Sequence, residues 1–327
     1  MLSELAFSAD DLARTRFAVA PMWEVATSFR LLAGGTSHPA HRSWLDQVRP
    51  RVAAAGLTTG WLADLVPAHG YLADFLTPFP AGANPTFEAE LAAIRATPPD
   101  QVRADVDMID DMVGGTTARR QALRADPRQR LARLTAEIEV YWELALAPYW
   151  AKIRALLDAD VFHRARQVAE RGAGHLLNDL HATVRWDANT LQLVRRHCTV
   201  SRRSSVPGLV LLPSAFATRV LTWDRPPHPP QLAYPARGTA MLWEQRPVAH
   251  ADAIAAVLGR SRAMLLTELG TPASTTELAR RTGISAAGIS QHLTALRDAG
   301  IVSSHRAGRS VLYARTSVAE SLLGLAD

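Results

Sequence analysis

The order of segments in residues 252–327 constrains this chain more than any other feature of its sequence. A helical pattern comes first, a short helix over 275–282 is closed by Gly283, and a second helix follows Ser285. Glycine commonly ends helices, and serine is a preferred residue just before a helix begins. Two helices joined by a turn of about three to four residues containing glycine form a helix-turn-helix. We therefore predict this motif near the C-terminus.

The second helix of the motif divides into an apolar and a polar face. Ile289, Leu293 and Leu296 recur at steps of four and three residues, so they are expected to pack on the rest of the domain. Small side chains let a helix enter the major groove, and glutamine can form two hydrogen bonds with adenine. We predict contacts with double-stranded DNA from the outward residues and their neighbours, namely Thr276, Ser285, Ala286, Ala287, Ser290, Gln291, Thr294 and Arg297.

A β-hairpin is expected after the second helix. Residues 301–306 and 311–315 have strand character, and the turn between them carries Arg306 and Arg309, which could reach phosphates or enter a narrow minor groove. Between positions 274 and 315, six arginines against two acids leave a local net charge of +4. A last helix over 317–325 presents an apolar stripe suited to dimerisation, made of Val318, Leu322 and Leu325.

These segments together resemble one family. The stretches Thr276–Ser285, Ile289–Leu293, Leu296–Val302 and Arg306–Tyr313 are similar to those of the ArsR-type winged-helix transcriptional regulators. The resemblance covers the end of the chain and implies a homodimer that contacts DNA through the second helix and the hairpin, called the wing. The long preceding region resembles the uncharacterised N-terminal extension of some large members, which transfers no residue roles.

Metal sensing is not expected from this resemblance. Family members that sense metals carry a Cys-x-Cys after Glu-Leu on the first helix of the motif, whereas here Glu277 and Leu278 are followed by Ala279. The last helix has no histidine, so thiophilic or zinc-type ions lack donors at both usual positions. We predict no metal site and no cofactor.

The rest of the chain suggests two further regions. Residues 1–180 show mainly helical patterns, including a capping box at Ser8 and a helix that begins at Asp126-Pro127 and is split at Pro148. Residues 181–245 contain short β-like runs, one of them at 199–202, and a proline-rich stretch over 225–235 that suits a linker or strap. The predicted fold class is α+β and mostly α: a helical N-terminal region with a small antiparallel sheet, then a winged helix-turn-helix over 246–327.

Composition narrows the class of protein further. Lys152 is the only lysine, so the other 35 of the 36 basic residues are arginine, and the net charge of +5 is mild for 327 residues. This arginine usage gives each arginine less functional weight. The apolar runs are too short for the ~20 residues of a membrane helix, and the N-terminus has acids where a signal peptide has basic residues. We therefore expect a cytoplasmic protein with no membrane partner.

The predicted function is a sequence-specific DNA-binding regulator, a repressor, acting as a homodimer. Grouped aromatic residues in the N-terminal region could line a pocket for a small organic effector, and ordinary core packing is the alternative. Two other hypotheses stay open for that region: an oligomerisation scaffold without an effector, and an enzyme domain. The sequence contains no Gly-x-Ser-x-Gly, Walker or His-Glu-x-x-His motif that would support an enzyme, so no enzymatic activity is predicted.

Overall fold

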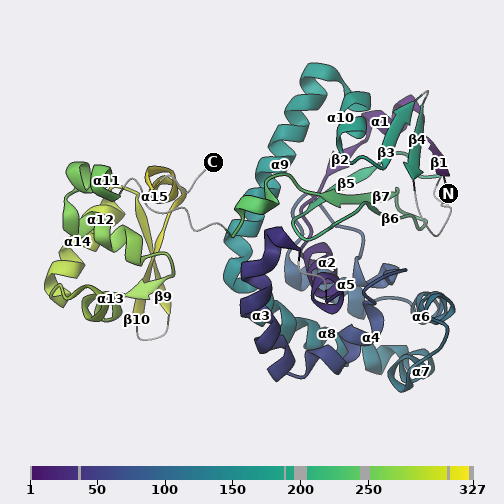
Figure 1. Cartoon of the computed structure of the whole chain (residues 1–327), viewed down its shortest axis with the longest axis horizontal. Coiled ribbons are helices and arrows are strands. Elements are labelled where there is room, and N and C mark those ends of the chain that lie inside the picture. Colours follow the sequence, from purple (N-terminus) through teal and green to yellow (C-terminus); the bar gives the residue numbers. More distant parts are fainter. Residues whose placement is uncertain are drawn as a thin grey trace. The chain divides into compact units, whose positions relative to one another are not determined.

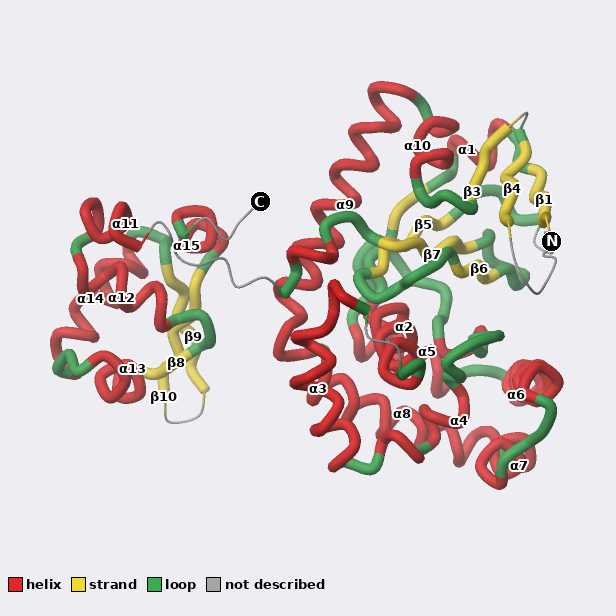
Figure 2. The backbone as a smooth tube through the Cα atoms, viewed as in Figure 1, coloured by secondary structure: helices red, strands yellow, loops and turns green. Residues whose placement is uncertain are grey.

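The computed structural model describes residues 2–35, 38–187, 189–194, 205–243, 251–307 and 310–323. The chain forms two compact units, Met1–Trp243 and Glu244–Asp327, which we call the N-terminal unit and the C-terminal unit (Figure 1). Helices predominate, and small sheets complete each unit (Figure 2). The predicted class, α+β and mostly α with a C-terminal helix-turn-helix domain, is confirmed.

Most of the N-terminal unit is helical. Its helices pack around one large apolar core that contains Trp44, Leu134, Ile138 and Tyr141. Each of these four side chains is fully enclosed. The helices are α1 (Ala9–Ala13), α2 (Pro21–Ala33), α3 (Arg42–Ala54), α4 (Trp61–Leu65), α5 (Phe87–Arg95), α6 (Pro99–Val113), α7 (Ala118–Ala125), α8 (Pro127–Ala145), α9 (Trp150–Arg171) and α10 (Ala173–Asp179).

Local signals in the sequence predicted several helix ends correctly. The Ser8 hydroxyl accepts a hydrogen bond from the Asp11 amide, and the Asp11 carboxylate accepts one from the Ser8 amide, which completes the capping box of α1. Asp126 caps α8 by accepting from the amide of Gln129 at 3.3 Å. A 3-10 turn around Pro148 separates α8 from α9, because proline offers no amide hydrogen to continue the first helix.

Among its described residues, the N-terminal unit has two sheets. One is antiparallel, in the order β1 (Leu2–Ala6), β4 (Thr190–Val194) and β3 (Val184–Asp187). The other is mixed, in the order β2 (Arg16–Phe17), β5 (Val210–Ser214), β7 (Gln231–Pro235) and β6 (Leu221–Trp223), with β5 parallel to both β2 and β7. The single small antiparallel sheet predicted for residues 181–245 is therefore incomplete as a description of this unit.

The mixed sheet is buried on both faces. Leu211 and Tyr234 pack toward α10 and the antiparallel sheet, while Leu212 and Ala233 pack toward Trp23 of α2. Parallel strands covered on both sides have nearly continuous apolar runs, as β5 does. The sheet is thus an internal part of the N-terminal unit.

The boundary predicted near residue 180 is wrong for this reason. Strands β1 and β2 come from the start of the chain and pair with β4 and β5, so residues 181–243 have no separate core. The linker or strap predicted over 225–235 is also wrong in its second half, which forms β7 between β5 and β6. Gln231 to Tyr234 keep their amide hydrogens, and proline occupies only the last position of the strand. The strand predicted at 199–202 lies outside the described residues.

The C-terminal unit contains α11 (Ala251–Leu258), α12 (Arg260–Glu268), β8 (Ala273–Ser274), α13 (Thr275–Thr282), α14 (Ala286–Asp298), β9 (Val302–Ala307), β10 (Ser310–Arg315) and α15 (Ser317–Leu322). Gly259, with φ of 85°, separates α11 from α12, a conformation that residues with a Cβ rarely adopt. The three strands form one antiparallel sheet in the order β8, β10, β9.

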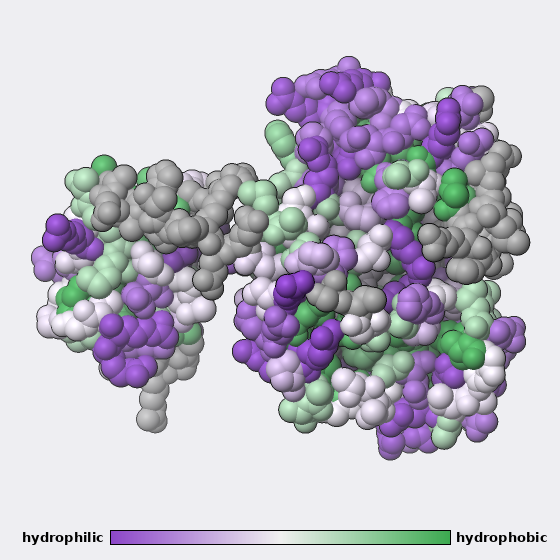
Figure 3. Space-filling model, viewed as in Figure 1, coloured by the Kyte–Doolittle hydropathy of each residue, from purple (hydrophilic) through white to green (hydrophobic). Residues whose placement is uncertain are grey.

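The surface of the molecule is mixed in polarity. On the viewed face, hydrophilic residues gather over the end of α9 and around α10 (Figure 3). Within the described ranges, no helix is both long and apolar enough to cross a membrane.

Candidate nucleic-acid interface

Three local features set the two ends of α13 and the start of α14. Ser274 caps α13 by accepting from the Glu277 amide at 3.3 Å. Gly283 ends that helix with φ of 73°. Ser285 then caps α14 by accepting from the amide of Gly288 at 3.2 Å. These caps satisfy amides that a helix end leaves without partners, so they set where each helix starts and stops.

Gly288 has a local explanation in this turn. A Cβ at this position would lie 3.2 Å from the Ile284 side chain and 3.3 Å from the Ser285 hydroxyl. Both contacts are therefore made within the turn itself. Glycine leaves room for the capping serine to reach its target.

The apolar face of α14 anchors the helix. Ile289 and Leu293 are fully buried and Leu296 nearly so, as the spacing predicted. They pack with Leu278 of α13 and Tyr313 of β10 in the core of the C-terminal unit. This packing turns the opposite face of α14 to the outside.

The structure places the predicted contact residues on the surface. Ala286, Ala287, Ser290, Gln291, Thr294 and Arg297 on α14 are exposed, as are Ser285 before it and Thr276 on α13. The Ser285 hydroxyl also caps α14, so that residue has a structural role whatever it contacts. The exposed face is short and polar, which is the character a helix needs to enter a major groove.

The hairpin forms the predicted wing. Strands β9 and β10 pair from Val302 with Arg315 to Ala307 with Ser310. Arg306 is exposed near the end of β9. Arg309 lies outside the described residues. Strand β8, which pairs with β10 through Leu312 and Tyr313, was not predicted from the sequence, since two residues are too few to show a period.

Two of the six arginines counted between positions 274 and 315 are paired with the two acids of that stretch, so the local net charge of +4 rests on the other four. Arg281 forms an ion pair with Glu277, and Arg297 forms one with Asp298 at 3.0 Å. The spacing of four residues between Glu277 and Arg281 was a signal for the first of these pairs. Two of the six counted arginines are therefore already neutralised.

Arg315 is engaged in a different way. It donates to the carbonyl oxygens of Leu266 and Thr267, both at 2.6 Å, and burial lowers its pKa from the usual value. Arg280 and Arg306 are exposed, and the described part of the chain holds no carboxylate partner for either. These two arginines are the cations best placed to meet phosphates.

Two large apolar side chains on α15 remain exposed. Val318 is 49% exposed and Leu322 is 44% exposed, whereas Leu325 lies outside the described residues. Val257 on α11, 83% exposed, is a third apolar side chain left without cover. As for metals, no group of three or more His, Cys, Asp or Glu side chains in the described ranges could hold an ion.

Comparison with known proteins agrees with this geometry. Residues 259–305, from the start of α12 into β9, match a family model described as a helix-turn-helix domain. No curated protein and no solved structure matches the chain. The chain therefore carries a helix-turn-helix DNA-binding domain of the kind found in regulators.

Proposed function

We propose that this chain is an ArsR-type transcriptional repressor that binds specific duplex DNA sequences as a homodimer. The observation that carries the proposal is the polar, exposed face of α14, held outward by the buried Ile289, Leu293 and Leu296 within a matched helix-turn-helix. In this arrangement α14 lies in the major groove and Gln291 contacts a base edge, while Arg306 reaches the backbone beside it.

The homodimer is supported by the apolar side chains of the C-terminal unit that solvent reaches. Val318 and Leu322 on α15 and Val257 on α11 would be covered by a second copy. Two symmetric copies would place two α14 helices about one turn of DNA apart, so the operator would be an inverted repeat.

The N-terminal unit is proposed to control this binding through a small organic effector and to have no enzymatic activity. Its core is separate from that of the C-terminal unit, so it is available for a role of its own. An effector changes DNA affinity only by binding the competent and incompetent forms of the dimer unequally.

The test begins with the full-length protein and a pool of random duplexes. Repeated selection should enrich an inverted repeat, and Gln291→Ala should then relax preference at one base pair of each half-site. A bidentate base contact is worth about 1 to 3 kcal/mol, so discrimination there should fall by about fivefold to 150-fold. The measurement is competition between the selected duplex and duplexes with single base changes.

The matched control is Gln121→Ala, which removes the same side chain from an exposed position on α7. It should leave both affinity and selectivity unchanged. Selection that enriches no sequence would overturn the proposed function. Enrichment with unchanged selectivity in Gln291→Ala would keep the function and assign the base contact elsewhere on α14.

A further inference from the structure

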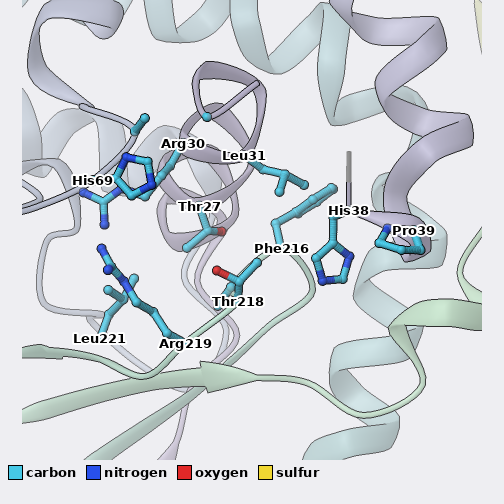
Figure 4. Close-up of a pocket in the computed structure, with 13 residues that line it drawn as sticks. Thr27, Arg30, Leu31, His38, Pro39, His69, Phe216, Thr218, Arg219 and Leu221 are labelled. Atoms are coloured by element: carbon cyan, nitrogen blue, oxygen red, sulfur yellow. The ribbon is translucent and has the colours of Figure 1, made fainter. Parts of the chain in front are cut away.

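A pocket of about 300 Å³ lies in the N-terminal unit, between α2, the chain just before α3 and the loop that follows β5. This volume is at the small end of the range for ligand sites. Figure 4 shows Arg30, His69 and Arg219 gathered on one side of it and His38 and Phe216 on the other. The pocket thus has a basic side and an aromatic side.

Arg30 on the basic side has one unsatisfied nitrogen. Its Nε donates to the carbonyl oxygen of Pro67 at 3.0 Å, and its Nη2 donates to that of Tyr71 at 3.2 Å. The Nη1 atom is buried and has no hydrogen-bond partner. Carbonyl oxygens orient a guanidinium but do not neutralise it, and buried cations are normally paired. The site therefore holds a cation with a donor still to be satisfied.

A second guanidinium raises the demand for an anion. Burial, and then the like charge of Arg219, lower the pKa of Arg30 from its usual value to about 10. The thirteen residues that line the pocket include two arginines and two histidines but no Asp or Glu. Arginine binds carboxylates and phosphates in a planar, two-bond geometry, so an acidic group fits here.

The opposite side suits an apolar body. Leu31, Pro39 and Phe216 lie on this side of the pocket (Figure 4). Phe216 is almost fully buried and stacks on His41 with ring centroids 4.9 Å apart, so its ring is held in place. A ring or short hydrocarbon chain would pack against this wall.

A second pocket shows why the first is the better site. It is larger, about 550 Å³, and is also lined by arginines, among them Arg164. That guanidinium already lies 2.6 Å from the carboxylate of Asp179. Its lining also includes Glu170, so the cations there have acids beside them.

We propose that the pocket between α2 and the loop after β5 binds a small organic acid, with its carboxylate on Arg30 and Arg219 and its apolar body against Phe216. The unpartnered Nη1 of Arg30 supplies a hydrogen bond to the carboxylate. Aromatic carboxylates of about the size of benzoate match both sides of the cavity.

The aromatic side of the pocket is continuous with the end of the N-terminal unit. Phe216 packs on Trp44 with centroids 4.7 Å apart and lies 6.1 Å from Trp243, the last residue of this unit. The Trp243 indole donates to Nδ1 of His41 at 2.8 Å. Burial lowers the pKa of His41 to about 4, so the ring is neutral and Nδ1 can accept.

Binding of the acid in the pocket therefore changes the surroundings of Trp243, the residue at which the N-terminal unit ends. A ligand that presses on Phe216 alters the packing of Trp243 and His41. This regulatory step rests on the proposed function, whereas the binding of the acid does not. The two parts can be tested separately.

The binding test uses the full-length protein, calorimetry, and four probes: benzoate, phenylacetate and their uncharged amides. Benzoate or phenylacetate should bind at least about tenfold more tightly than its amide, because only the acid brings an anionic acceptor to the unpartnered Nη1 of Arg30. Arg219→Gln, at an exposed position, should weaken the acid by about tenfold without affecting folding. Arg133→Gln, an exposed arginine on α8 outside the pocket, is the matched control and should bind as the wild type does.

Several results would overturn the pocket proposal. They are no heat with either acid, equal binding of acid and amide, or unchanged binding in Arg219→Gln. Arg30→Lys gives a second check, because it keeps the positive charge but loses the planar, two-bond geometry of the guanidinium. Its affinity for the acid should fall more than its affinity for the amide. If selection enriches a DNA sequence but no acid binds, the proposed function stands and this inference fails.

We call the step from the pocket through Phe216 to Trp243 the relay. It is tested with the selected duplex and the acid that binds best. That acid should change the DNA affinity of the wild type by about fivefold or more, the lower end of typical coupling. Trp243→Leu should bind the acid normally and lose this change. Retention of the change in Trp243→Leu would exclude the relay through Trp243.

Discussion

The two units treat polar groups in opposite ways. All fourteen polar or charged residues that are buried in the described chain lie in the N-terminal unit, and seven of these carry an acidic or a guanidinium group. The described core of the C-terminal unit is built from apolar side chains together with Tyr313. A unit that presents a helix to DNA needs only a firm apolar base. A unit that holds loops around a pocket needs internal polar contacts to fix them.

In the N-terminal unit, buried carboxylates make the polar contacts that hold loops in place. Asp105, which is fully enclosed, accepts from the Phe75 amide at 2.9 Å and the Tyr71 hydroxyl at 3.1 Å, and it lies 2.5 Å from Arg225. Tyr71 and Phe75 belong to one segment and Arg225 to another, so Asp105 joins these two segments to α6. Such networks specify geometry and are costly when incomplete.

The largest effect that tests this contrast is expected from Asp160→Ala. Asp160 accepts from the Tyr234 hydroxyl at 2.7 Å and the Arg237 amide at 3.1 Å, and it lies 3.7 Å from the buried Arg164. Its removal leaves the Tyr234 hydroxyl and the Arg237 amide without their acceptor and takes one of two nearby carboxylates from Arg164, so the free energy of unfolding should fall by about 3 to 5 kcal/mol. Urea unfolding followed by tryptophan fluorescence measures this for the N-terminal unit alone, because all eight tryptophans lie at or before Trp243.

The control for this prediction is on the same helix. Asp158 is half exposed and pairs only with Arg154, at 3.0 Å, so Asp158→Ala should cost less than about 1 kcal/mol. Equal effects of the two substitutions would contradict the idea that buried carboxylates hold this unit together.

A smaller effect, dependent on pH, is expected from Glu24→Gln. Burial raises the pKa of Glu24 from 4.5 to about 8, because the charged form loses its hydration inside the core. A raised folded-state pKa stabilises at low pH, and the stability is lost as pH rises from about 4.5 through about 8. From about pH 6 to pH 8, the ionisation of Glu24 should lower the free energy of unfolding of the wild type by about 2 kcal/mol. The glutamine variant should not show this decrease.

The comparison should be made by urea unfolding at both pH values. Glutamine imitates the neutral acid and can still accept from the Ala215 amide, which lies 3.0 Å from the carboxylate. Glu90, whose pKa burial also raises to about 8, remains as a second source of the trend. Parallel pH profiles for wild type and variant would show that Glu24 is ionised in the folded state at both values.

The smallest effect on stability is expected from Arg306→Ala in the C-terminal unit. Arg306 is exposed, so the unfolding of both units should be unchanged within about 0.5 kcal/mol. If its guanidinium neutralises one phosphate, the slope of log affinity against log salt concentration should fall by about one unit, and by about two with Arg309→Ala added. Arg306→Lys keeps the charge and should restore the slope. An unchanged slope would place the hairpin away from the backbone, and a shift in sequence preference would favour contact in the minor groove.

The helix-turn-helix could be predicted from sequence because its signals are local. Ser285 and Gly283 lie within a few residues of the helix ends they define, and Ile289 and Leu293 are one turn apart. The exposed positions of Gln291 and Arg306 follow from the same period and turn. Their roles in DNA binding stay predictions.

The pairing of charges could be predicted only in part. The i,i+4 spacing of Glu277 and Arg281 is visible in the sequence, but the engagement of Arg315 with carbonyl oxygens of α12 is not. Counting charged residues therefore gave the local net charge of +4 but not which arginines are already engaged. That depends on which side chains the fold brings together.

By itself, the sequence determined where α13 and α14 begin and end and which face of α14 is buried, since caps and apolar periods act over a few residues. Only the tertiary structure decided that a proline-rich stretch supplies β7 and that β2 pairs with β5 across almost the whole N-terminal unit. It also brought Arg30, His69 and Arg219 to one pocket. Those outcomes depend on contacts between distant segments, whose choice of partner is made by packing of the whole core and leaves no period or cap in the local sequence.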